Sequence, residues 1–153
     1  MKLFPWQKKK VFFSSEQQNR IVQAIQTAEQ QTSGEVRVFV ESKCSYMDAL
    51  DRAKEIFFNL QMHKTALRNA VLVYVATDDK QVAVFADEGI HTQTGQTYWE
   101  NTVDTMLHQF VRNHIVDGIV QSVLKIGDAL QHYFPYDKAS DKNELPDDIV
   151  FGK

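Results

Sequence analysis

The chain has 153 residues, of which 43% are hydrophobic and 24% charged, and its formal net charge is -3. This length and composition suit one globular domain. The acidic balance disfavours a nucleic-acid-binding protein, because such proteins carry a basic patch, and the basic run here is the three lysines at 8–10. The single cysteine, Cys44, excludes an internal disulfide and a multi-cysteine zinc site.

No apolar run approaches the roughly 18 residues that a membrane-spanning helix requires. The first ten residues lack the apolar core of a signal peptide. We therefore expect a cytoplasmic protein without a membrane span, and a monomer. The aromatic residues Phe4, Trp6, Phe12 and Phe13 favour packing on the domain, and contact with an unidentified protein partner is the alternative.

The first predicted element is a helix that begins at Ser14 or Ser15, because both serines precede a glutamine by three residues in a capping-box pattern. Apolar residues then recur at helical spacing up to Ala28. The sequence at 32–34 ends the helix, and Gly34 suits the left-handed cap position. Residues 1–13 precede this helix and are expected to form an N-terminal extension.

Residues 35–41 predict a strand, with Val36 and Val38 on one face and Arg37 on the other. Residues 45–60 predict a helix with a buried apolar stripe. The next strand is expected at residues 70–76. A strand, a helix and a strand in this order predict a right-handed crossover, so the two strands should be parallel.

The two runs at 70–76 and 82–86 are apolar on both alternating faces, which is typical of strands covered on both sides. The polar segment 77–81 between them has the composition of a hairpin turn. The fold class that follows is α/β, an α/β/α sandwich with a short mixed β-sheet and helices on both faces.

After the hairpin we expect a loop at 88–97, a helix at 98–112 and a second helix at 114–133, which Pro135 ends. The core domain is thus expected over residues 14–135. Residues 136–153 form a polar C-terminal tail. In that tail, Leu145 and the apolar residues at 149–151 could close over a surface groove.

The predicted topology gathers acidic residues at one end of the sheet. Glu35 opens a strand there, and Asp87 and Glu88 follow the last strand. Arg68 lies at the same end. A further pair, Glu100 and Asp104, shares one face of the next helix, and that face could turn towards the other acids.

Such carboxylates repel one another unless a positive charge lies among them. Calcium takes six to eight oxygen ligands and magnesium six, so an oxygen-only group of Glu35, Asp87, Glu88, Glu100 and Asp104 favours calcium, or else magnesium, over zinc or copper. The alternative is a plain ion pair of Arg68 with Asp87, in which the other acids are solvated.

Five segments together resemble the TPM domain family: residues 33–38 (SGEVRV), 65–76 (TALRNAVLVYVA), 86–91 (ADEGIH), 98–100 (YWE) and 143–152 (NELPDDIVFG). The last of these is similar to the end of its small stand-alone bacterial members. The resemblance implies an α/β/α sandwich and divalent-cation binding, calcium especially, at an acidic cluster on one sheet edge. The family usually has glycine where this chain has Ala86.

Two functions remain open at this point. The first is a calcium-binding interaction module without turnover. The second is a metal-dependent acid phosphatase acting on phosphomonoesters, because plant members of the family are described as acid phosphatases. In that second reading Arg68 holds the phosphate and a metal-bound water attacks, while no catalytic nucleophile or base is identified in the sequence.

Overall fold

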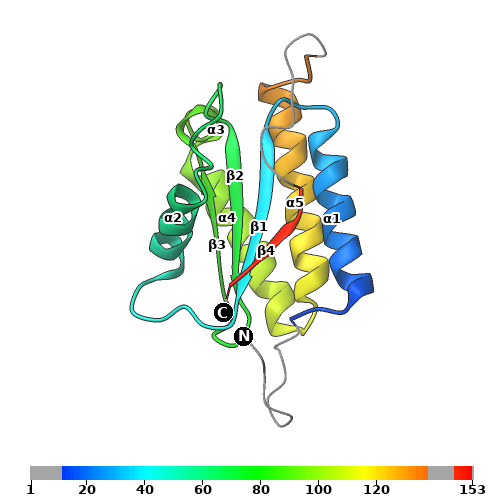
Figure 1. Ribbon diagram of the computed structural model, residues 1–153, viewed down its shortest axis with the longest axis vertical. Helices are drawn as coiled ribbons and strands as arrows, with labels where there is room; N and C mark the ends of the chain where they lie inside the picture. Colours follow the sequence, from blue (N-terminus) through cyan, green and yellow to red (C-terminus); the bar gives the residue numbers. More distant parts are fainter. Residues whose placement is uncertain (1–11, 138–146, 153) are drawn as a thin grey trace, which may run out of the picture.

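The computed structural model describes residues 12–137 and 147–152 (Figure 1). In chain order the elements are α1 (Ser15–Glu29), β1 (Glu35–Glu41), α2 (Ala49–Asn59), β2 (Ala70–Ala76), β3 (Gln81–Ala86), α3 (Glu88–Thr94), α4 (Gln96–Val111), α5 (Ile115–Tyr133) and β4 (Ile149–Phe151). Among the helices of these residues, none combines the length and hydrophobicity that crossing a bilayer requires.

The four strands form one mixed sheet in the order β3-β2-β1-β4. Strand β1 runs parallel to β2, with Glu35 opposite Ala70, and β2 and β3 form an antiparallel hairpin. The predicted crossover and hairpin are therefore confirmed. They form because the connection that contains α2 is long enough for the crossover that a parallel pair requires, while the four-residue connection between Ala76 and Gln81 permits only an antiparallel partner.

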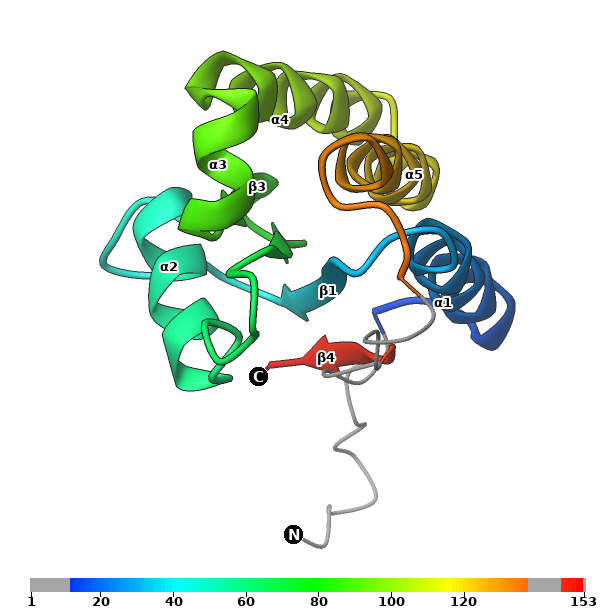
Figure 2. The same cartoon turned by 90° about the horizontal axis from the view of Figure 1, so that it is seen from above.

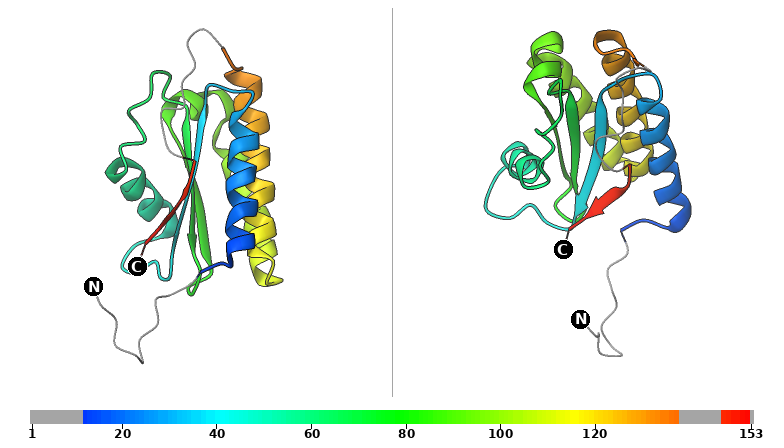
Figure 3. Two further views of the ribbon diagram at one scale, coloured as in Figure 1. Left: turned by 45° about the vertical axis from the view of Figure 1, so that its right-hand side comes forward. Right: turned by 45° about the horizontal axis from the view of Figure 1, so that its top comes forward.

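Helices cover both faces of the sheet, as predicted (Figures 2 and 3). Helices α1, α4 and α5 pack on the face that carries Val38, Val73 and Val84. Helix α2 packs on the other face, against Leu72 and the neighbouring residues of that face. Because successive strand residues point to opposite faces, the apolar runs on β2 and β3 supply both cores.

Helix α2 is tied to the sheet by a buried charged group at the end of β1. Two nitrogens of the Arg52 guanidinium, Nε and Nη2, donate to the Glu41 carboxylate at 2.9 Å each. The Tyr74 hydroxyl donates to the same carboxylate. Burial alone would raise the pKa of Glu41, but the bonds from Arg52 and Tyr74 outweigh it and the pKa is lowered.

Two local predictions were wrong. Residues 88–94 form helix α3 rather than a loop, because Asp87 caps its first turn and seven residues are too few to show a helical period. Gly34 does not adopt the left-handed conformation, since the only described glycine with a positive φ is Gly95. Gly34 is instead closely approached: a Cβ there would stand 2.7 Å from a methyl carbon of Leu130.

The C-terminal segment expected to dock forms an edge strand. Strand β4 pairs parallel with β1, with Ile149 opposite Val38, and the ring of Phe151 stacks on Phe12 at 5.5 Å between centroids. Leu145, the other apolar residue of the tail prediction, lies outside the described residues, as do Phe4 and Trp6. Residues 149–151 are therefore the part of the tail that joins the sheet.

Candidate functional site

The candidate site lies where β1 and β2 begin and β3 ends, at the upper end of the sheet in Figure 1. The Glu35 N–H donates to the Asn69 carbonyl at 3.3 Å, and the Asp87 N–H donates to the Ala70 carbonyl at 2.9 Å. Glu35, Ala70 and Asp87 thus form one row across three strands. Since neighbouring strands lie about 4.8 Å apart, the Cα atoms of Glu35 and Asp87 are roughly 10 Å apart.

Asp87 is both a helix cap and one half of an ion pair. Its carboxylate accepts the Glu88 N–H at 2.8 Å, where an acid at a helix N-terminus is favourable. It also accepts two parallel hydrogen bonds from Arg68, from Nε at 2.7 Å and from Nη2 at 2.8 Å. A third contact joins Arg68 Nη1 to the Glu88 carboxylate at 3.3 Å.

The backbone around Arg68 holds this guanidinium in place. Arg68 has a φ of 51°, in the left-handed region that residues with a Cβ rarely adopt. Its carbonyl accepts the Gly89 N–H at 2.8 Å, which joins the loop before β2 to the first turn of α3. The hydrogen bonds to Asp87 raise the pKa of the Arg68 guanidinium. The guanidinium therefore stays positively charged and paired with the carboxylates of Asp87 and Glu88.

Glu35 is 2% exposed, and it is near a carboxyl group that the sequence analysis missed. Glu29, the last residue of α1, accepts the Val36 N–H at 2.7 Å. Burial, a hydrogen bond with Asp147 and the charge of Glu35 together raise the pKa of Glu29 to about 10. A glutamate in the last turn of a helix, where the dipole disfavours it, was the available sequence signal.

A further ligand-type oxygen lies beside this row. Asn69 is 1% exposed, and its amide nitrogen donates to the Ser33 hydroxyl at 3.3 Å. Its amide oxygen, Oδ1, is buried and accepts no hydrogen bond from the described residues. Amide oxygens are ordinary ligands for calcium, so Asn69 adds to the oxygen donors at this end of the sheet.

The structure does not bring Glu100 and Asp104 to this group. Both lie on α4 and line a groove whose floor includes Val82 and Val84 of β3. Those strand residues precede Asp87 by three to five positions, which corresponds to roughly 10–16 Å along the strand. Of the five predicted ligands, Glu35, Asp87 and Glu88 share the sheet end and the other two lie elsewhere. Within the described residues, no three Asp, Glu, His or Cys side chains are gathered as a ready metal site.

The chain matches the model of a known protein family. The family model of the TPM domain matches residues 7–129. The chain therefore belongs to the TPM domain family. A comparison with curated proteins found no match.

Solved structures share the fold of this chain. The chain is similar to the BA42 protein from the psychrophilic bacterium Bizionia argentinensis, with 40% identity, a TM-score of 0.85 and coverage of 95% of this chain and 99% of that one. The N-terminal domain of the cg2496 protein from Corynebacterium glutamicum shares the fold at 12% identity and a TM-score of 0.62, over 78% of this chain and 74% of that chain. An N-terminal domain from P. gingivalis shares it at 15% identity and a TM-score of 0.64, over 80% and 78%.

Proposed function

We propose that the protein binds a divalent cation, calcium in the first place and magnesium as the alternative, at the sheet end, and that it does so without turnover. Glu35 and Asp87 are the proposed ligands, with Glu88 as the third. The observation that carries the proposal is the buried row: two carboxylates, each 2% exposed, stand on either side of Ala70.

Buried carboxylates are costly unless a hydrogen-bonding or charged partner compensates them. In the group formed by Arg68, Asp87 and Glu88, one guanidinium faces two carboxylates, so the group carries a net charge of -1. The Arg68 guanidinium therefore occupies the position that a bound metal ion would take between these carboxylates. A divalent ion that reached Asp87 would compete with the guanidinium and supply one more positive charge than Arg68 does.

The donor set suits calcium. The side chains of this sheet end supply oxygen donors, two carboxylates in the row and the amide oxygen of Asn69 beside it. Calcium accepts six to eight such oxygens in flexible geometry, whereas magnesium demands a near-ideal octahedron. The Asn69 amide oxygen is buried and accepts no hydrogen bond from the described residues. Of the atoms at this site, it most directly supports the proposal that a cation binds here.

The alternative, a metal-dependent acid phosphatase acting on phosphomonoesters, requires Arg68 to hold an anionic phosphate. The Arg68 guanidinium already forms two hydrogen bonds to Asp87 and one contact to Glu88. A phosphate would have to displace those carboxylates and enter a group of net negative charge. This geometry favours a cation-binding module over the phosphatase.

Thermal unfolding with calcium tests the proposal. A cation bound only by the folded state stabilises it by about 2.7 kcal/mol at a hundredfold excess over its dissociation constant, which for a domain of this size raises Tm by roughly 5–10 °C. Asp87→Asn should abolish this rise. The matched variant Asp104→Asn, on α4, should retain it. An unchanged wild-type Tm at millimolar calcium, or loss of the rise in Asp104→Asn alone, would contradict the proposal.

The phosphatase alternative has its own assay. Release of p-nitrophenol from p-nitrophenyl phosphate is followed with calcium, with magnesium and with a chelator. We expect no turnover above the buffer rate in any of the three. Metal-dependent turnover that Arg68→Gln removes would establish the phosphatase instead.

A further inference from the structure

Strand β3 is an outer strand of the sheet, and among residues 12–137 and 147–152 no strand lies beside one side of its backbone. The Asp87 N–H bonds inward to β2, so by the alternation of an antiparallel pair Phe85, Ala83 and Gln81 also face β2. The N–H and C=O groups of Val82, Val84 and Ala86 then point outward. No backbone hydrogen bond from another described segment reaches these outward groups.

Charged residues and proline, which protect many outer strands, are absent from this edge. Natural edge strands are blunted by lysine, proline, a bulge or extreme shortness. Strand β3 has the sequence QVAVFA, without a charge or a proline, over six residues. The opposite edge, β4, is only three residues long. The β3 edge is therefore the one suited to pairing with another strand.

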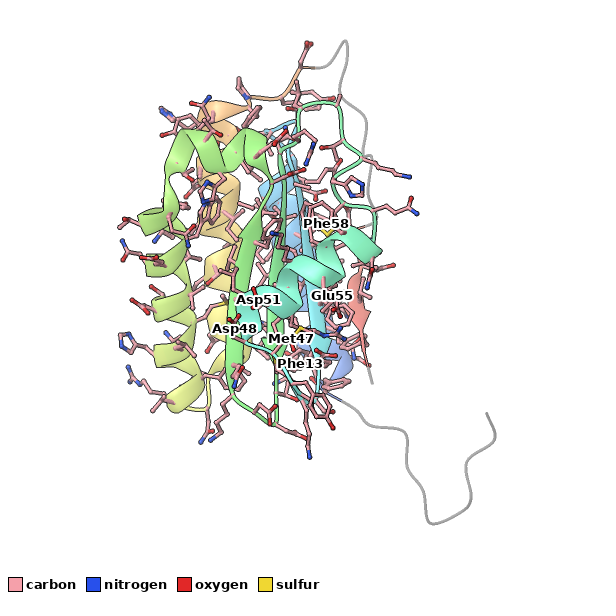
Figure 4. All side chains as sticks on the ribbon, turned by 90° about the vertical axis from the view of Figure 1, so that its left-hand side faces the viewer. Phe13, Met47, Asp48, Asp51, Glu55 and Phe58 are labelled. Atoms are coloured by element: carbon pink, nitrogen blue, oxygen red, sulfur yellow. The ribbon has the colours of Figure 1, made fainter. Side chains whose placement is uncertain are left out.

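A groove runs along this edge between α2 and α4. It has a volume of about 250 Å³. Its floor is apolar, and it is lined by Leu50, Val82, Ala83, Val84, Trp99 and Val103, together with polar side chains of α4. Figure 4 views this side of the molecule and shows β3 between the two helices.

Carboxylates line the groove on the α4 side, and two more lie near it at the start of α2. Glu100 and Asp104 line it from α4, and Figure 4 places Asp48 and Asp51 beside β3 at the start of α2. All four residues are exposed. Within the described part of the chain, no ion pair involves any of them. Asp48 also caps α2 by accepting the Asp51 N–H at 2.9 Å. The groove thus combines an apolar floor, outward backbone groups and an acidic rim.

We propose that the outer edge of β3 binds an extended segment of a partner protein in which apolar and basic residues alternate. The segment adds a strand to the sheet: its main chain bonds to Val82, Val84 and Ala86, its apolar side chains occupy the groove, and its lysine or arginine side chains meet the acidic rim. A second copy of this chain is the less suitable occupant, because two identical edges would place acidic rims against each other.

A synthetic peptide tests this directly. The probe is fluorescein-labelled Lys-Val-Lys-Val-Lys-Val-Lys with blocked ends, and its binding is followed by fluorescence anisotropy and by amide hydrogen exchange. We expect saturable binding and slowed exchange at the Val82, Val84 and Ala86 amides, whose N–H groups point outward in the free protein. Absence of protection at these amides would overturn the proposal.

Two controls separate strand pairing from charge attraction. The first control is a peptide that is N-methylated at alternate residues, on the edge that faces β3. It keeps its charge but loses the backbone N–H groups that would donate to β3, so its affinity should fall at least about tenfold. The double variant Glu100→Gln/Asp104→Asn should weaken the unmodified peptide about threefold to tenfold. The control variant Glu16→Gln/Asp128→Asn removes the same charge from exposed sites on α1 and α5 and should leave the affinity unchanged.

Equal binding of the N-methylated peptide would mean charge attraction alone and would overturn the proposal. Protection of the β3 amides that grows with protein concentration, without peptide, would identify a second copy as the occupant and would also overturn it. These readouts are independent of the calcium-dependent Tm, because the groove and the sheet end have separate residues.

Discussion

Gly89 in the first turn of α3 lies against the backbone of Leu67: a Cβ on Gly89 would stand 2.1 Å from the Leu67 carbonyl oxygen and 2.6 Å from that of Arg68. The Gly89 N–H completes this contact by donating to the Arg68 carbonyl at 2.8 Å. Only a residue without a side chain permits the approach. The contact holds Arg68 beside Asp87, so the geometry of the proposed cation site depends on it.

Gly89→Ala should therefore destabilise the protein strongly. The methyl group would meet backbone rather than a flexible side chain, which places this change at the upper end of the about 1–3 kcal/mol that overpacking typically costs. Urea unfolding measures the loss. Gln93→Ala, an exposed change on the same helix, should stay within about 0.5 kcal/mol. Equal stabilities for the two variants would show that the loop adjusts to the methyl group.

Arg68→Gln tests the competition between the guanidinium and the cation. Removal of the positive charge leaves Asp87 and Glu88 without their ion-pair partner. We expect Tm without calcium to fall and the rise caused by calcium to become larger than in the wild type. Differential scanning fluorimetry with and without calcium measures both. Arg20→Gln, which breaks the exposed pair with Asp117, is the control and should change neither. A smaller calcium response in Arg68→Gln would show that Arg68 supports the site instead.

Glu29→Gln tests the buried carboxyl group beside Glu35. The pKa of Glu29 is raised from 4.5 to about 10, so the folded state holds this proton more tightly than the unfolded state does. That contribution to stability is complete below about pH 4.5 and is lost as the pH rises towards 10. Glutamine retains the acceptor for the Val36 N–H and a donor for Asp147 without an ionisable proton.

The variant should therefore be more stable than the wild type at pH 8 and similar to it at pH 4. Its free energy of unfolding should fall less steeply across this range, by at most about 1.4 kcal/mol per pH unit. Urea unfolding at several pH values gives the comparison. Glu16→Gln, an exposed change on the same helix, should follow the wild-type curve. Parallel curves for wild type and Glu29→Gln would contradict the raised pKa.

Tyr74→Phe tests the buried group that anchors α2. The change removes the hydroxyl that donates to Glu41 and leaves Arg52 in place. Loss of a buried hydrogen bond to a charged group costs about 1.5–3 kcal/mol. Chemical denaturation measures this, with Tyr136→Phe at an exposed site as the comparison. No difference between the two would mean that Arg52 alone satisfies Glu41.

The layered fold could be predicted from the sequence because the strands around Ala70 and Val84 are apolar on both faces, which requires helices on both sides of the sheet. The same topology correctly placed Glu35 and Asp87 at one end. Sequence spacing also placed Glu100 and Asp104 on one face of a helix. Spacing does not determine which way that face turns about the helix axis, and in the structure it lines the groove beside β3 instead of the sheet end.

Other parts of the site could not be predicted, since they depend on contacts between distant segments. Glu29 and Asp147 meet only because β4 pairs with β1. A strand of three residues has too short a pattern to distinguish it from a loop. Helix α3 was missed for a similar reason, because its seven residues are too few to show a helical period.

The position of β4 has a consequence for the growing polypeptide on the ribosome. Strands β1, β2 and β3 and all the described helices precede β4 in the chain, so they can emerge and begin to pair first. The outer side of β1 then stays open until Ile149–Phe151 emerges. During synthesis the nascent domain therefore presents two unpaired sheet borders, and only the one beside β1 closes when β4 emerges. A chaperone that recognises exposed strands would therefore find the most unpaired backbone on this domain just before β4 emerges.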